Sequence, residues 1–108
     1  MVAFNDELMA TALDDVSAER LRQHEAHGEQ DLPITHASAA AIMPTEESAR
    51  RACEWAEKRG HLSYAHLLIE EVTEAMAAPT PEAQRAELVQ VAALAVQAIE
   101  CIDRRSGT

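Results

Sequence analysis

The sequence has little of what β structure requires. Its 108 residues include only three Gly and four Pro, and runs in which β-branched and polar residues alternate are almost absent. Strands are recognised from such alternation between turns rich in Gly and Pro. The sequence therefore predicts an all-α protein.

Cysteine is also scarce. Cys53 and Cys101 stand far apart, without the spacing of a CxxC motif. Their number and spacing exclude a disulfide-rich framework. We expect two reduced, partly buried thiols.

Positive charge is in short supply, because 9 Lys and Arg stand against 19 Asp and Glu, for a net charge of −10. Polyanions would be repelled, so neither nucleic acid nor an anionic membrane is an expected partner. No apolar run is long enough to span a bilayer, and the sequence does not open on a basic segment followed by an apolar one, so we expect no signal sequence. We expect a cytoplasmic protein whose partners are cations, metal-bound ligands or other proteins.

Length and composition predict one domain over residues 1–108, since 47% of the residues are hydrophobic. Thr45, Ser63 and Thr80 are the expected N-caps of the last three of the four predicted helices, and Gly60 follows the second helix as a C-terminal signal. The predicted helices cover about 6–27, 46–59, 64–77 and 81–104. The first carries a second cap signal near Asp14, where it would be interrupted. Residues 28–44 contain Pro33 and Pro44 and are expected to form a loop or lid without a regular element.

The last predicted helix is apolar on almost every side. Between Leu88 and Ile99 only Gln90 and Gln97 interrupt the apolar residues. A helix of this kind needs cover on most sides, which is more than three modestly amphipathic neighbours provide. We therefore expect the protein to form a homo-oligomer through this helix.

Carboxylates recur at helical spacing in the last two predicted helices. Glu70, Glu71 and Glu74 form the pattern EExxE, and Glu87 precedes Gln90 by three residues. Residues three or four apart project from one side of a helix, so two facing helices would aim these oxygens at one point. At about 100° per residue, Glu71 and Glu87 lie on the apolar stripes of their helices.

Placing ionised carboxylates on such apolar stripes costs free energy. Two carboxylates about 4 Å apart repel each other by roughly 4 kcal/mol at an effective dielectric constant near 20, before any desolvation. They must be protonated, paired with Arg or Lys, or bound to a metal, and the stripes hold no basic residue. Oxygen ligands favour Mg²⁺, with Mn²⁺ as an alternative, over zinc. The other interpretation is an ordinary solvated acidic surface.

These residues resemble a known family. EEVTE at 70–74, followed by Glu87 and Gln90, is similar to the EExxE and ExxD motifs of the MazG-like all-α nucleoside triphosphate pyrophosphohydrolases. The flanking segments SYAHLLIEEVTEA and AELVQVAALAVQAIECIDRR are also similar, so the resemblance covers most of the chain. It implies a helical module, assembled as dimers or tetramers, that uses Mg²⁺ to cleave (d)NTPs between the α- and β-phosphates into a nucleoside monophosphate and pyrophosphate.

The resemblance also implies roles for single residues. Glu71 and Glu74 match the metal ligands of the first motif helix, and Glu87 matches the first ligand of the second. Glu70 matches the remaining carboxylate, a candidate for orienting or deprotonating the attacking water. Gln90 stands where an Asp ligand is expected. Its amide oxygen can bind a cation but carries no charge, so metal affinity or the number of metals should be lower.

Nucleotide contacts are expected before the first motif helix. In related proteins this region contributes to the nucleotide pocket, which implies base stacking on Trp55 and phosphate contacts from Lys58 and Arg59. From the residues alone, a Trp55 packed in the core and two cations at a helix C-terminus are an equal alternative. Tyr64 lies two turns before Glu71 on nearly the same face, where it would line the cleft or pack in the core.

Two other functions stay open. One is a catalytically weakened member of the family that binds nucleotide or metal without turnover. The other is a helical assembly protein without a ligand, whose acids are surface charge.

Overall fold

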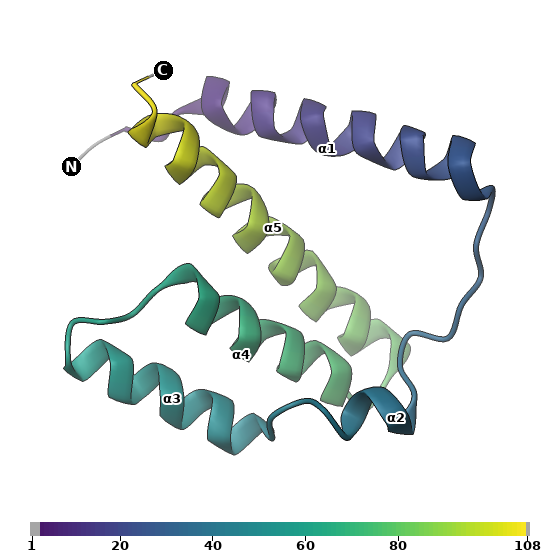
Figure 1. Cartoon of the computed structure of the whole chain (residues 1–108), viewed down its shortest axis with the longest axis vertical. Helices are drawn as coiled ribbons and strands as arrows, with labels where there is room; N and C mark the ends of the chain where they lie inside the picture. The colour runs from purple at the N-terminus through teal and green to yellow at the C-terminus, as the bar shows by residue number, and fades with distance from the viewer. Residues whose placement is uncertain (1–2, 108) are drawn as a thin grey trace. The chain divides into compact units, whose positions relative to one another are not determined.

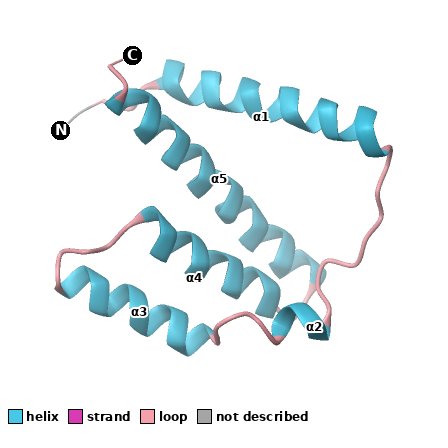
Figure 2. Cartoon of the chain, viewed as in Figure 1, coloured by secondary structure: helices cyan, strands magenta, loops and turns pink. Residues whose placement is uncertain are grey.

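The computed structural model describes residues 3–107, and within that range it is built from helices and contains no strand (Figures 1 and 2). The prediction of an all-α protein is confirmed. The helices are α1 (Asp6–His27), α2 (Ala37–Ala40), α3 (Glu46–Lys58), α4 (Tyr64–Ala77) and α5 (Pro81–Arg105).

The chain divides into two compact units. One contains α1 and the last part of α5, from Val96 onward, and the other spans residues 33–95 and contains α2, α3, α4 and the first part of α5. All the carboxylates singled out from the sequence belong to the second unit. Whether the protein acts as one domain stays a prediction.

The ends of α3 follow the predicted signals. The Thr45 hydroxyl accepts a hydrogen bond of 3.0 Å from the backbone N–H of Ser48, which caps the first turn. After the last turn Gly60 has φ +72°, and the N–H of His61 donates to the carbonyl oxygen of Ala56 at 2.8 Å. This pairing is the Schellman arrangement, in which a residue without a side chain turns the chain out of the helix.

Hydroxyl caps also begin α4 and α5. The backbone N–H of His66 donates to the Ser63 hydroxyl at 3.4 Å, and the N–H of Ala83 donates to the Thr80 hydroxyl at 3.1 Å. Pro81 takes the first position of α5, where its missing N–H costs nothing. The short segment between α4 and α5 therefore forms a tight helical hairpin.

Within residues 33–95, α3 packs against α4 (Figure 1). The buried residues of α3 are Ala49, Cys53 and Ala56, which recur at helical spacing on one face. The Cys53 thiol donates to the carbonyl oxygen of His66 at 3.3 Å, so α3 and α4 run close together. Burial, with a smaller effect of the Glu70 charge, raises the pKa of this thiol. Cys53 and Cys101 are both buried and free, as expected.

Two expectations about the first half of the chain were wrong. The first helix is continuous from Asp6 to His27, because a cap signal near Asp14 inside a run of helix formers does not break the hydrogen-bond ladder. Residues 28–44 are not without a regular element, since α2 forms one helical turn there. The ring of His36 accepts from the N–H of Ser38 at 3.1 Å, and the Ala residues that follow favour helix.

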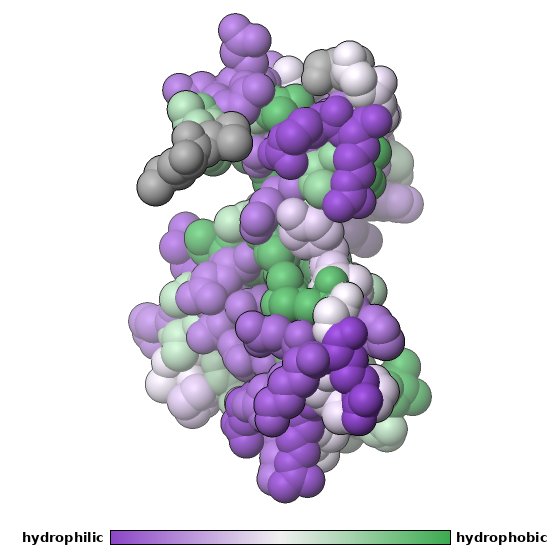
Figure 3. Space-filling view, turned by 90° about the vertical axis from the view of Figure 1, so that its left-hand side faces the viewer, coloured by the Kyte–Doolittle hydropathy of each residue, from purple (hydrophilic) through white to green (hydrophobic). Residues whose placement is uncertain are grey.

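Few residues are deeply buried in either unit. Within residues 3–107 no large side chain is fully buried, and the buried core consists mainly of Ala and Cys. Large apolar side chains are exposed instead, among them Leu88 and Val89 on the apolar part of α5. Figure 3 shows hydrophobic residues lying open between hydrophilic ones on one face of the molecule. No helix in the described range has the length and apolar character required to cross a membrane.

Candidate metal site

Three of the predicted ligands lie together. One carboxylate oxygen from each of Glu71, Glu74 and Glu87 lies within 4.8 Å of the other two, and all three side chains are half-buried. Around Mg²⁺, with bonds of 2.0–2.1 Å, opposite oxygens are about 4.2 Å apart. Oxygens that lie within 4.8 Å of one another are therefore close enough for a single cation to contact all three residues.

The helical hairpin produces this convergence. Glu71 and Glu74 project from one side of α4 because they are three residues apart, and Glu87 comes from the second turn of α5. The Gln84 side-chain amide donates to the carbonyl oxygen of Ala75 at 3.2 Å, which joins the start of α5 to the end of α4. Local helix geometry and one tertiary hydrogen bond therefore bring the carboxylates together.

Two oxygens of the cluster are buried without a partner. Within the described residues, Oε2 of Glu71 and Oε2 of Glu87 receive no hydrogen bond. In the neighbouring helix α3, Arg50 and Arg51 form ion pairs with Glu54 and Glu47, not with these carboxylates. A buried polar atom without a partner is costly, and a carboxylate more so. A bound cation would satisfy both oxygens, so the residues present fit a divalent metal.

The pKa shifts in the cluster agree with the burial and close spacing of its carboxyl groups. Burial raises the pKa of Glu71, and the charges of Glu87 and Glu70 raise it further. Burial also raises the pKa of Glu74, with added contributions from the charges of Glu71, Glu70, Glu87 and Glu46. Negative charges crowded in this way favour either a proton or a cation.

A pocket of about 430 Å³ opens beside the cluster and includes Glu74 and Glu87 in its lining. Glu46, from the first turn of α3, lies in the same lining. From the sequence alone, Glu46 is an acid in the first turn of a predicted helix, where it favours the helix dipole. The packing of α3 on α4 brings it here, and only the knowledge that those two helices pair could have indicated it.

Glu70 and Gln90 flank the cluster. Glu70 is half-buried and lies close enough to Glu71 and Glu74 for its charge to raise the pKa of both. Gln90 is exposed, one turn of α5 beyond Glu87. Of the five predicted residues of the metal and catalytic site, three converge closely and the other two are neighbours in the helices.

The predicted nucleotide-binding residues lie apart from this pocket. Trp55 is 58% exposed, and the Arg59 guanidinium lies over its ring at 4.3 Å from the centroid. The alternative of a Trp55 packed in the core is therefore wrong. Lys58 is exposed and Tyr64 half-buried, and neither of them, nor Trp55 or Arg59, contributes to the lining of the pocket beside the carboxylates.

Comparisons of the chain with protein-family models, with curated protein sequences and with solved structures found no match.

Proposed function

We propose that this protein is a Mg²⁺-dependent, MazG-like nucleoside triphosphate pyrophosphohydrolase that acts as a homo-oligomer. The observation that supports this function is the convergence of Glu71, Glu74 and Glu87, which have one oxygen each within 4.8 Å of the others, together with an unpartnered buried oxygen on both Glu71 and Glu87. The residue pattern of the two helices that carry them supports the same reaction. The exposed apolar side chains of α5 support assembly of several copies.

In this reaction the protein would contribute negatively charged side chains that hold the cation and a carboxylate placed to act on the attacking water. A nucleoside triphosphate carries about four negative charges, which the acidic surface would repel without a cation between them. Mg²⁺, when bound, supplies Lewis-acid polarisation of the α-phosphate and offsets charge on the leaving pyrophosphate. Glu71, Glu74 and Glu87 would hold the ion, and Glu70 would accept a proton from the attacking water.

Turnover of purified protein tests this function. We expect nucleoside monophosphate and pyrophosphate to form from at least one member of a panel of ribo- and deoxyribonucleoside triphosphates when Mg²⁺ or Mn²⁺ is present. Glu71→Gln should abolish product formation, while Glu57→Gln, which changes an exposed acid of α3, should not. Absence of product from every nucleotide, for the wild type and for Gln90→Asp alike, would contradict the proposal.

A second function is favoured by Gln90, which is exposed and uncharged where the family motif has Asp. A protein with one carboxylate fewer would bind cation and nucleotide more weakly and could serve as a binding module without turnover. Gln90→Asp should then tighten Mg²⁺ binding roughly tenfold, because affinity rises with the number of charged ligands. Gln97→Asp adds the same charge at another exposed position of α5 and should leave Mg²⁺ affinity nearly unchanged.

Calorimetry separates the two functions. Nucleotide binding that requires Mg²⁺ but yields no product would select the binding module. Product formation by the wild type selects the enzyme.

A further inference from the structure

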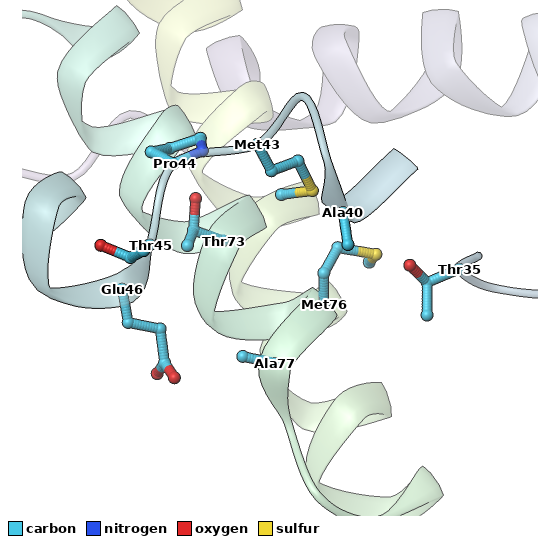
Figure 4. Close-up of a pocket in the computed structure, with 9 residues that line it drawn as sticks. All are labelled: Thr35, Ala40, Met43, Pro44, Thr45, Glu46, Thr73, Met76 and Ala77. Carbon is cyan, nitrogen blue, oxygen red and sulfur yellow. The ribbon is translucent and has the colours of Figure 1, made fainter. Parts of the chain in front are cut away.

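A second pocket, of about 340 Å³, lies within residues 33–95 (Figure 4). Met43 enters it from the loop before α3, and Met76 enters it from α4. Threonine, proline and small apolar side chains complete most of the lining. The volume lies within the range of small-molecule sites, which are mainly apolar with a few polar groups.

The lining suits a flat ring better than a charged group. Two thioethers are polarisable, adapt their shape and make favourable contacts with aromatic rings. Thr73 already donates its hydroxyl proton to the carbonyl oxygen of Ile69 at 2.7 Å, so its oxygen can only accept from a ligand. Among the described residues that line the pocket there is no Lys or Arg, and Glu46 adds negative charge, so the lining does not favour a phosphate.

This pocket adjoins the candidate metal site. Glu46 and Ala77 belong to the lining of both pockets, and the second of these contains Glu74 and Glu87. A ligand that fills both would have an uncharged ring at one end and, at the other, an anionic group that meets the carboxylates through a cation. A nucleotide has both parts, since its base is an uncharged ring and its phosphates are anionic.

We propose that the Met43–Met76 pocket receives the nucleobase of the nucleotide whose phosphates are bound at the Glu71–Glu74–Glu87 site. The inference rests on the proposed function and deepens it, because it locates the part of the site that reads the base. It moves the base away from Trp55, on which stacking was expected from the sequence. Base preference would then depend on α4 and on the two segments that flank α2, which carry Thr35 and Met43.

Methionine methyl resonances test the proposal directly. The chain contains few methionines, and Met9, in α1, provides a control within the same spectrum. The protein with ¹³C-labelled methionine methyl groups is titrated with purine and pyrimidine α,β-methylene triphosphates in Mg²⁺, and separately with inorganic triphosphate in Mg²⁺. We expect ring-current shifts of the Met43 and Met76 methyl groups with the nucleotide analogue only, and no shift of Met9.

Filling the pocket gives a second readout. Ala40 is exposed and lines the pocket, so Ala40→Phe should occupy it without disturbing the buried face of α3 or α4. By calorimetry this variant should bind the nucleotide analogue roughly tenfold more weakly and inorganic triphosphate as the wild type does. Ala39→Phe, also exposed and outside the lining, should bind both ligands normally. Thr35→Phe fills the same pocket from the loop if Ala40→Phe does not fold.

The possible failures are distinguishable. If analogue and triphosphate both bind but the Met43 and Met76 methyl groups do not respond, the base pocket is wrong and the metal site stands. The same conclusion follows if Ala40→Phe and Thr35→Phe bind the analogue normally. If neither ligand binds in Mg²⁺, the proposed function fails and the base pocket fails with it.

Discussion

The side-chain amide of Gln84 donates a hydrogen bond of 3.2 Å to the backbone carbonyl oxygen of Ala75. This bond ties the first turn of α5 to the last turn of α4, one turn away from Glu87 and next to Glu74 in the chain. It therefore sets how far the carboxylate of α5 stands from the two carboxylates of α4.

Gln84→Ala should lower the affinity for Mg²⁺, although Gln84 is not one of the proposed metal ligands. Loss of a hydrogen bond of this kind costs about 1 kcal/mol, and Glu87 would lose its fixed position relative to α4. We expect a smaller rise in melting temperature on adding MgCl₂ than in the wild type. Gln97→Ala, which changes an exposed residue of the same helix, should retain the full rise. An undiminished rise in Gln84→Ala would show that the bond does not position Glu87.

Glu71→Gln should have opposite effects with and without metal. In the presence of a chelator it removes like-charge repulsion and one unpartnered buried carboxylate, so the melting temperature should rise. In MgCl₂ the variant should fail to gain the stability that a bound cation adds, which is about 2.7 kcal/mol at a hundredfold excess over Kd. Differential scanning calorimetry measures both. Glu57→Gln is the matched control, and equal responses of the two variants would contradict the metal site.

The metal-free protein should gain stability from Glu71 and Glu74 as the pH falls. Burial and neighbouring charges raise the pKa of both carboxyl groups above their ordinary value of 4.5. A carboxyl group that binds its proton more tightly in the folded state favours folding below its folded pKa, and this contribution disappears at higher pH. The difference in melting temperature between wild type and Glu71→Gln, measured in chelator from pH 7 to 4.5, should therefore shrink on acidification.

The stabilisation by Mg²⁺ should depend on pH in the opposite direction. Protons compete with the cation for the same oxygens, so the stabilisation by MgCl₂ should be largest near neutral pH and decline on acidification. A magnesium effect that is constant from pH 7 to 4.5 would argue against carboxylate ligands.

Trp55 should contribute little to stability. Its side chain is 58% exposed, and the Arg59 guanidinium lies over the ring. Trp55→Ala should cost at most about 1 kcal/mol in urea unfolding, in contrast to the 3–5 kcal/mol typical of a buried aromatic residue. A cost in the higher range would indicate that another copy of the chain covers this residue. Because Trp55 is the only tryptophan, its fluorescence also reports whether a nucleotide base stacks on it.

Sequence reasoning was most successful where the signals are local. Thr45, Ser63 and Thr80 cap the helices that they were expected to cap, because a hydroxyl and the N–H groups of the next turn are neighbours in the chain. The convergence of Glu71 and Glu74 with Glu87 follows in the same way from helical spacing and a short turn. The sequence does not predict the cap of α2, because His36 uses a ring nitrogen, which is not a usual N-cap group.

Features that depend on helix pairing could not be predicted in this way. Glu46 reaches the carboxylate pocket only because α3 packs on α4, and its place in the sequence indicates nothing beyond a helix start. The exposure of Trp55 likewise depends on which face of α3 meets α4. A single sequence does not specify that face when the buried residues are as small as Ala49 and Ala56.

The three converging carboxylates all lie within residues 71–87, in one hairpin whose connection spans only residues 78–80. Short loops close at small entropic cost, and contacts between residues near in sequence form early in folding. The acids would therefore meet, and repel one another, while the rest of the chain is still unfolded. A cation that binds this hairpin would speed the folding of the protein as well as raise its final stability.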